Sequence, residues 1–367
     1  MRIRGIELVA LKLKLKDRFE TSFGAVDERE ILLVRLEAEA GVSWSEVVAD
    51  RDPYYSGETV ETARHIIREF LAPLLRETAV SGGRDAFRIC SRVRGNPMAR
   101  AAVEMGIWNL EAMEKGVPLS HLLGGNRSRV AAGVSVGIQE SAPAMLDKIA
   151  AYLDRGYCRI KVKIKPGKDV DIIRSIRRRF PDIHLMADAN AAYTLDDSPL
   201  LAALDDYRLM MIEQPLSHDD ILDHGELARI LRTPICLDES IRSSHDCRLA
   251  LQLKSCSIIN IKPGRVAGFT ESIAIHDACR EASVPVWCGG MLESGIGRAY
   301  NVHLATMPNF ELPGDISESA RYWAEDIVEP TWVLREGHLD VPTGPGLGVK
   351  VREDLIEKYA IARERIV

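Results

Sequence analysis

The sequence predicts an α/β protein: a TIM-type (β/α)7β barrel that follows an N-terminal α+β capping domain. The first observation is a rhythm of ionisable residues, each ending a short apolar run, with steps of 25, 25, 25 and 24 residues: Lys163, Asp188, Glu213, Asp238 and Lys262. One strand–helix unit of such a barrel has about that length. The second is that the first 125 residues lack this rhythm and place strand-like runs before helix-like ones.

The capping domain is expected at residues 1–125, and a Gly-Gly-Asn linker at 124–126 ends it. Apolar residues recur there first at strand and then at helix spacing. The expected elements are strands at 2–16, 30–40 and 42–48, and helices at 59–76, 83–92 and 97–115.

The barrel is expected at residues 126–330, because short apolar runs there alternate with helical patterns. The expected strands are 131–137, 159–164, 183–187, 209–212, 233–237, 257–261, 284–288 and the short 309–312. Helices are expected between them, for example at 169–180, 225–231 and 266–282. The remainder, 331–367, is rich in Gly and Pro at 342–348 and is expected to return to the capping domain.

Composition excludes several classes of partner. The 367 residues carry a net charge of −6, without the basic excess typical of proteins that bind nucleic acid or anionic membranes. No apolar run reaches the length of a membrane span, and residues 1–16 alternate too regularly for a signal peptide. The seven cysteines form no CxxC pair, so a reducing cytoplasm is the expected location. The expected partner is a small-molecule carboxylate; a homo-oligomer is a weaker expectation.

Three carboxylates at equal spacing predict a site for one divalent cation. The ends of parallel barrel strands share one rim, so Asp188, Glu213 and Asp238 are expected to lie together there. Carboxylate ligands that leave positions open suit Mg²⁺ or Mn²⁺. The alternative is that each carboxylate only caps the helix that follows it.

The lysines predict proton transfer beside that cation. Lys161, Lys163 and Lys165 share one strand face, which by itself would also fit a solvated edge strand. Lys163 is expected to act as base, with its pKa lowered by Lys161, and Arg265 is expected to lower the pKa of Lys262 in the same way. Two lysines on opposite sides of a substrate permit removal and return of a proton α to a carboxylate.

Other residues are candidates for substrate contact, each with an ordinary structural alternative. Phe19 and Phe23 would cover an apolar part of the substrate or pack between the domains, and Trp323 has the same two interpretations. Ser135 would donate to the substrate carboxylate. Gly289 and Gly290 would let a ligand approach backbone N–H groups, or simply end a strand.

Five strings together resemble the enolase superfamily, in particular its muconate-lactonising subgroup: Lys161-Val-Lys163, Ala187-Asp-Ala-Asn190, Ile212-Glu-Gln-Pro215, Leu237-Asp-Glu-Ser240 and Asn260-Ile-Lys-Pro-Gly-Arg265. Within the subgroup the chain is most similar to the o-succinylbenzoate synthase / N-succinylamino acid racemase family. That likeness rests on residues 21–24, 133–137, 287–295 (which include Met291), 312–317 and 342–348.

The resemblance implies that Asp188, Glu213 and Asp238 bind the metal and that Lys163 and Lys262 are the acid/base pair. Lys161, Arg265 and Asn190 would support them, and Met291 would join the substrate contacts. The implied activities are dehydration of 2-succinyl-6-hydroxy-2,4-cyclohexadiene-1-carboxylate in menaquinone biosynthesis and racemisation of N-succinylamino acids.

Some alternatives remain open within and outside the superfamily. A dipeptide epimerase would usually have Asp-x-Asp where this chain has Asp315-Ile316-Ser317. A muconate-type cycloisomerase and a non-catalytic binding barrel are the others. Arg18, where the family usually has an apolar residue or Pro, leaves the fine substrate preference open.

Overall fold

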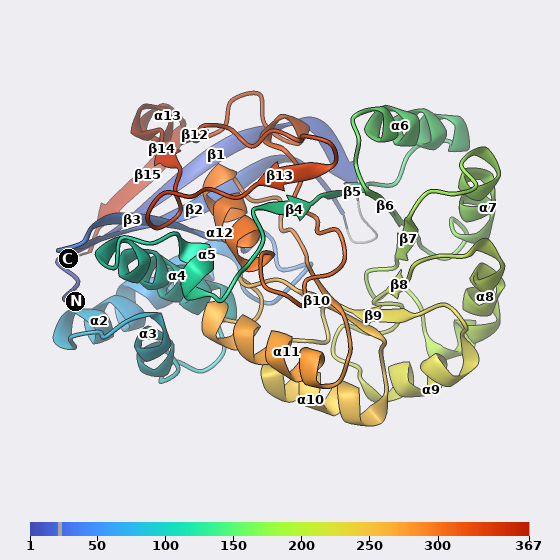
Figure 1. Cartoon of the computed structure of the whole chain (residues 1–367), viewed down its shortest axis with the longest axis horizontal. Coiled ribbons are helices and arrows are strands. Elements are labelled where there is room, and N and C mark those ends of the chain that lie inside the picture. Colours follow the sequence, from blue (N-terminus) through green and yellow to red (C-terminus); the bar gives the residue numbers. More distant parts are fainter. Residues whose placement is uncertain (21–23, 367) are drawn as a thin grey trace.

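The computed structural model describes residues 1–20 and 24–366 and has two parts, an antiparallel cap and a barrel (Figure 1). The cap sheet has the strand order β15-β1-β2-β3. Its strands are β1 (Gly5–Glu20), β2 (Ala25–Ala38), β3 (Gly41–Val47) and β15 (Ala360–Arg365). In β1, Leu11, Leu13 and Leu15 are buried while the lysines between them are exposed, which is the alternation that predicted the strand.

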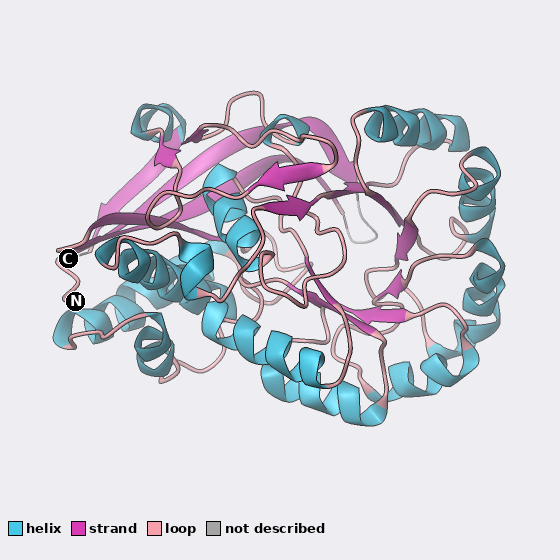
Figure 2. Ribbon diagram, in the orientation of Figure 1, coloured by secondary structure: helices cyan, strands magenta, loops and turns pink. Residues whose placement is uncertain are grey.

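Helices of the cap cover one face of this sheet (Figure 2). They are α1 (Val60–Ile66), α2 (Ala72–Glu77), α3 (Gly83–Cys90) and α4 (Pro97–Glu114). The short α5 (Leu119–Leu122) follows α4 and packs into the barrel cluster. A π-helical turn at Ile67–Leu71 joins α1 to α2, so the single helix predicted at 59–76 is confirmed as one continuous helical stretch.

The barrel sheet is parallel, and its seven strands follow chain order from β5 to β11. They are β5 (Gly133–Val136), β6 (Arg159–Lys163), β7 (Leu185–Asp188), β8 (Ile212–Glu213), β9 (Ile235–Leu237), β10 (Ile258–Ile261) and β11 (Val286–Cys288). Around them lie α6 (Ala142–Asp154), α7 (Val170–Arg179), α8 (Ser198–Ala202), α9 (Leu222–Ile230), α10 (Ser244–Leu253), α11 (Phe269–Glu281) and α12 (Gly295–Leu304). Short 3₁₀ helices occupy Leu195–Asp197, Ala203–Tyr207 and Ser319–Arg321.

The eighth strand position is filled by an irregular segment rather than a regular strand. Phe310 bridges to Val286 of β11, and Gly314 bridges to Ala132 next to β5. The amide of Gly133 also donates to the carbonyl of Gly314 at 2.7 Å. Pro308 and Pro313 have no amide hydrogen to give to a ladder, which explains why the predicted strand at 309–312 stays irregular. The segment still closes the ring, and the predicted fold class is confirmed.

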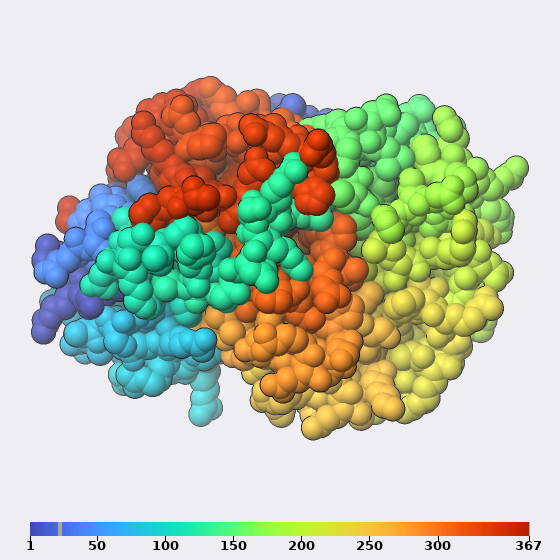
Figure 3. Space-filling model, viewed as in Figure 1, coloured from blue at the N-terminus to red at the C-terminus, as the bar shows by residue number. Residues whose placement is uncertain are grey.

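The C-terminal residues lie along both parts. β13 (His338–Asp340) pairs with β4 (Arg129–Ala131), which breaks the first predicted barrel strand into β4 and β5. β12 (Val328–Glu329) pairs with β14 (Lys350–Val351), and α13 (Glu353–Tyr359) leads into β15. In the space-filling view this segment, in red, lies across the junction of cap and barrel (Figure 3).

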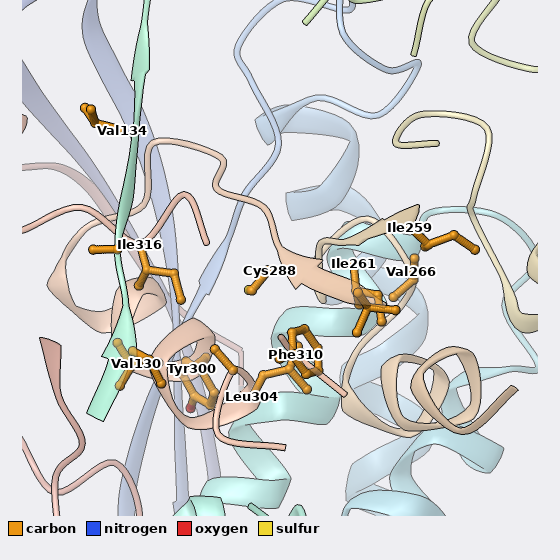
Figure 4. Close-up of a cluster of buried hydrophobic side chains, with 14 of the residues drawn as sticks. Val130, Val134, Ile259, Ile261, Val266, Cys288, Tyr300, Leu304, Phe310 and Ile316 are labelled. Atoms are coloured by element: carbon orange, nitrogen blue, oxygen red, sulfur yellow. The ribbon is translucent and has the colours of Figure 1, made fainter. Parts of the chain in front are cut away.

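One hydrophobic core runs through the barrel and under the cap. Ile261, Cys288 and Phe310, from neighbouring strand positions, join it together with Leu304 of α12 (Figure 4). A second cluster fills the space between the cap sheet and its helices. Within the described ranges, no helix combines the length and apolar character needed to cross a membrane.

Two glutamates of the cap bind the N-termini of barrel helices. Glu104 of α4 accepts hydrogen bonds from the amides of Phe269 and Thr270, both at 2.9 Å, where α11 begins. Glu46 of β3 accepts from the amide and hydroxyl of Ser294, at 3.1 and 2.5 Å, where α12 begins. Glu104 therefore satisfies N–H groups at the start of α11 from the other domain. At the start of α12 Glu46 shares this role with Asp326 and Ser294, which accept from the amides of Gly295 and Ile296.

Candidate active site

Strand register brings the predicted ionisable residues to one rim. Lys163 pairs with Asp188 across β6 and β7, and Asp188 pairs with Glu213 across β7 and β8. Asp238 and Lys262 directly follow the last residues of β9 and β10. All five side chains belong to buried residues at the carboxyl ends of successive strands, as the spacing predicted.

Lys161 lies at the centre of the cluster. Its Nζ is 3.0 Å from Asp188 Oδ2, 3.0 Å from Glu213 Oε2 and 2.7 Å from Asp315 Oδ2. Burial lowers the pKa of Lys161, but the three carboxylates together raise it well above its usual value. Lys161 is therefore a permanent cation beside Lys163, as the prediction required.

Lys163 has two partners from the strand next to it. Its Nζ is 2.6 Å from Asp188 Oδ2 and donates to Asn190 Oδ1 at 2.5 Å. The amide nitrogen of Asn190 in turn donates to Glu239 Oε1 at 3.0 Å. Asn190 thus fixes the position of the Lys163 ammonium group and is itself held by a buried carboxylate.

Lys262 differs from the expected arrangement in its electrostatics. Its Nζ donates to Asp238 Oδ2 at 2.8 Å, while Arg265 binds the other oxygen of the same carboxylate. Burial lowers the pKa of Lys262, but Asp238 and Tyr55 outweigh burial and Arg265, so the pKa lies above its usual value. Arg265 acts in the predicted direction and is outweighed by the carboxylate between the two cations.

Glu213 lies between the two other carboxylates and is fully buried. Asn260 donates to its Oε1 at 2.8 Å, and Lys161 contacts its Oε2. Burial and the neighbouring Asp188 carboxylate raise the pKa of Glu213 to about 8. Among the described residues, no three His, Cys, Asp or Glu side chains stand ready-made as a metal-binding group; here each carboxylate contacts a lysine instead.

Three residues of this cluster were missed or given no role at the site. The carboxylate of Asp315 forms ion pairs with Lys161 and, at 2.8 Å, with Arg159. It also accepts a hydrogen bond from the hydroxyl of Ser135 at 3.0 Å. Arg159 lies on the same face as Lys161 and Lys163, so the strand alternation could have revealed it. Tyr55 contacts Lys262 from a loop of the cap, and no sequence pattern links the two.

The candidate substrate contacts are dispersed in the structure. Ser135 is buried and directs its hydroxyl to Asp315. Gly289 follows β11, and a β-carbon there would clash with Asn260 Oδ1 and stand 2.8 Å from Lys262 Cε, so this glycine makes room for both side chains. At Gly290 a β-carbon would lie 2.6 Å from the carbonyl oxygen of Asp315.

The apolar candidates are packed into cores. Phe19 and Trp323 belong to the large barrel cluster, and the indole nitrogen of Trp323 donates to the carbonyl of Glu293 at 3.2 Å. Met291 belongs to the cap cluster. Phe23 lies outside the described residues. Contact of these residues with substrate stays a prediction.

Two cavities approach the cluster from different sides. The larger, about 590 Å³, lies between cap and barrel, and its lining includes Tyr55, Asn190, Glu239 and Arg265. The smaller, about 240 Å³, reaches Lys163 from the side of α6 and α7. Lys163 therefore borders the smaller cavity directly, and Tyr55, which contacts Lys262, borders the larger one.

The chain is similar over its length to known proteins. Residues 4–124 match the family described as mandelate racemase / muconate lactonizing enzyme, N-terminal domain, and residues 144–355 match enolase C-terminal domain-like. It is 50% identical to the o-succinylbenzoate synthase of Geobacillus kaustophilus, covering 97% of this chain and 96% of the relative. It is 46% identical to the N-succinylamino acid racemase of an Amycolatopsis species, covering 99% of both.

Its fold is that of solved relatives. An enolase-superfamily member from Listeria innocua superimposes with a TM-score of 0.97 at 40% identity, over 100% of this chain and 99% of the other. The matched domains and the level of identity agree, and the chain belongs to the mandelate racemase / muconate lactonizing enzyme family of the enolase superfamily.

Proposed function

We propose that the protein is an o-succinylbenzoate synthase that also racemises N-succinylamino acids. In the first reaction, 2-succinyl-6-hydroxy-2,4-cyclohexadiene-1-carboxylate loses its α-proton and its hydroxyl group as water. The observation that carries the proposal is a carboxylate cluster with a lysine on either side, Lys163 at Asp188 and Lys262 at Asp238. One relative at 50% identity is named o-succinylbenzoate synthase and one at 46% is named N-succinylamino acid racemase, which supports a shared site for both reactions.

Asp188, Glu213 and Asp238 would hold one divalent cation, Mg²⁺ or Mn²⁺. The donor set fits, since it consists of buried carboxylate oxygens, the ligands that these hard cations prefer. The raised pKa of Glu213 also fits, because burial and then the neighbouring Asp188 and Asp238 carboxylates disfavour its charge, which a bound cation would offset. When bound, the cation would stabilise the negative charge that grows on the substrate carboxylate.

The lysines would divide the remaining work according to their partners outside the carboxylate triad. Lys161 keeps the charged Asp315, so it would stay a cation and stabilise negative charge. Lys163 keeps the neutral amide of Asn190, and Lys262 the neutral phenol of Tyr55. Asp188 and Asp238, which contact Lys163 and Lys262, would be shared with the bound cation. A lysine left with a neutral partner loses its proton more readily than one that keeps its own carboxylate, so Lys163 and Lys262 are the candidate bases.

In the synthase reaction Lys163 would remove the α-proton and return a proton to the departing hydroxyl, while Lys262 stabilises charge. In the racemase reaction one lysine would remove the α-proton and the other would deliver a proton to the opposite face. Ser135, Phe19, Phe23, Gly289, Gly290, Met291 and Trp323 are the proposed substrate contacts. A cytoplasmic location would suit these metabolites.

The alternative of a dipeptide epimerase is disfavoured by Asp315. Its carboxylate is 8% exposed and already receives Lys161, Arg159 and Ser135, so it has little capacity left for a substrate ammonium group. A cycloisomerase would use the same lysines and differs only in substrate. A non-catalytic barrel would have no need of three buried lysine–carboxylate contacts, which cost desolvation energy.

Purified protein with Mg²⁺ is expected to convert the cyclohexadiene substrate to o-succinylbenzoate and to racemise N-succinylamino acids. A chelator should abolish both activities, and Mg²⁺ or Mn²⁺ should restore them. Muconate and an Ala–Glu dipeptide serve as competing substrates. Faster turnover of either, or full activity in verified metal-free protein, would contradict the proposal.

A further inference from the structure

One contact of Lys262 comes from the cap rather than from the barrel. The hydroxyl of Tyr55 accepts a hydrogen bond from its Nζ at 2.9 Å, and the same Nζ lies 4.8 Å from the centre of the Tyr55 ring. Tyr55 therefore holds the ammonium group by its hydroxyl, with the ring beside it.

The loop that carries Tyr55 is fixed at its ends. The backbone amide of Val60 donates to the carbonyl of Asp50 at 3.0 Å, which closes the loop at its base. Glu58 accepts from the amides of Met98 and Ala99, both at 2.8 Å, where α4 begins. The anchored loop of the cap thus places Tyr55 against Lys262, and a displacement of that loop would change this contact.

Among the residues that the structure describes, Lys163 is held from the barrel. Its Nζ is held by Asp188 and Asn190, both of which follow or end β7 of the barrel. Lys262 is therefore held by Asp238 of the barrel and by Tyr55 of the cap, whereas the contacts of Lys163 among the described residues come from the barrel. This asymmetry predicts that a change at Tyr55 affects the two proton transfers unequally.

We infer that Tyr55 is a positioning residue for Lys262, through which the cap loop at residues 50–59 controls one of the two proton transfers of the racemase reaction. The inference rests on the proposed function. Burial raises the pKa of Tyr55 to about 12, so the phenol keeps its proton at neutral pH. A neutral phenol accepts a hydrogen bond from the ammonium form of Lys262 and donates one to the amine form, so it holds the base in both states.

The test is the variant Tyr55→Phe, which keeps the ring and removes only the hydroxyl. Exchange of the α-proton in deuterated water is measured for each enantiomer of an N-succinylamino acid with Mg²⁺-loaded enzyme. Lys163→Arg and Lys262→Arg assign each enantiomer to its lysine. Tyr54→Phe is the matched control, since Tyr54 is 72% exposed in the same loop.

Tyr55→Phe is expected to slow exchange of the enantiomer assigned to Lys262 by about 10-fold or more, because small displacements of a reacting group cost rate steeply. Exchange of the other enantiomer, the KM of both and the thermal midpoint should change little, and Tyr54→Phe should match the wild type. Equal slowing of both enantiomers, or of neither, would overturn the inference while leaving the proposed function standing. Absence of exchange in the wild type would overturn the racemase proposal itself, and this inference with it.

Discussion

At the scale of single residues, Asp315 is the carboxylate that the buried cations Lys161 and Arg159 share. Lys161 and Arg159 both contact its carboxylate, and all three residues are nearly inaccessible to solvent. Removing one member of a buried ion cluster typically costs about 3–5 kcal/mol. Asp315→Asn is therefore expected to lower the free energy of unfolding by that order, measured by urea denaturation.

Asp340→Asn is the matched control for this change. Asp340 also contacts an arginine, Arg129 at 3.2 Å, but its side chain is 52% exposed. An exposed ion pair contributes about 0–1 kcal/mol, so this variant should stay close to the wild type. If Asp315→Asn cost no more than Asp340→Asn, Asp315 would not be the partner that stabilises the two buried cations.

The two candidate bases make a second prediction at this scale. Lys163 and Lys262 contact different carboxylates of the triad, Asp188 and Asp238. In deuterated water Lys163→Arg should stop exchange into one enantiomer of an N-succinylamino acid, and Lys262→Arg into the other. In the synthase reaction each change should cost on the order of 10²-fold, the usual loss for a positioned acid/base or charge-stabilising group. Exchange of both enantiomers in either variant would reject the two-base arrangement.

At the scale of elements, the start of α12 depends on the protonation of Glu46. Burial is the main cause that raises the pKa of Glu46 from 4.5 to about 7, and the nearby Glu293 carboxylate raises it further. The hydroxyl of Ser294, Arg29 and the amide of Gly297 act in the opposite direction and lower it. Because the folded state binds this proton more tightly than the unfolded state, the stabilisation is full below about pH 4.5 and is lost as the pH rises to about 7.

Glu46→Gln removes this titration. As the pH rises from about 4.5 to 7, the wild type should therefore lose up to about 3 kcal/mol of unfolding free energy relative to the variant. Urea denaturation across that range measures the drift, and Glu39→Gln, with a 70% exposed carboxylate in the same domain, is the control. A constant difference over the range would show that Glu46 has the same pKa in both states.

At the scale of the whole molecule, a bound cation would stabilise the fold by mass action. A ligand at 100 times its dissociation constant contributes about 2.7 kcal/mol. Mg²⁺ is therefore expected to raise the thermal midpoint of the wild type. The shift between metal-free and Mg²⁺-loaded protein should be much smaller in Glu213→Gln, and calorimetry measures it. An equal shift in both proteins would place the binding site elsewhere.

The sequence predicted the barrel and its rim well because both depend on local patterns. A strand ends where its apolar run ends, so Lys163, Asp188 and Glu213 could be assigned to one level of the rim from spacing alone. The eighth strand was harder, since its hydrogen bonds come from isolated bridges of Phe310 and Gly314. Tyr55 could not be found at all: its contact with Lys262 joins residues 207 positions apart in different domains.

The glutamates at the helix starts restrict how this cap can be exchanged. A barrel separated from its cap would begin α11 and α12 without the acceptors that Glu104 and Glu46 provide. The cap is therefore no independent module, and recombination between relatives is tolerated only where the incoming cap carries a carboxylate at both positions. Chimeras built by domain shuffling should divide along that line into those that assemble and those that lose the cap's acceptors, where α12 would keep only Asp326 and Ser294.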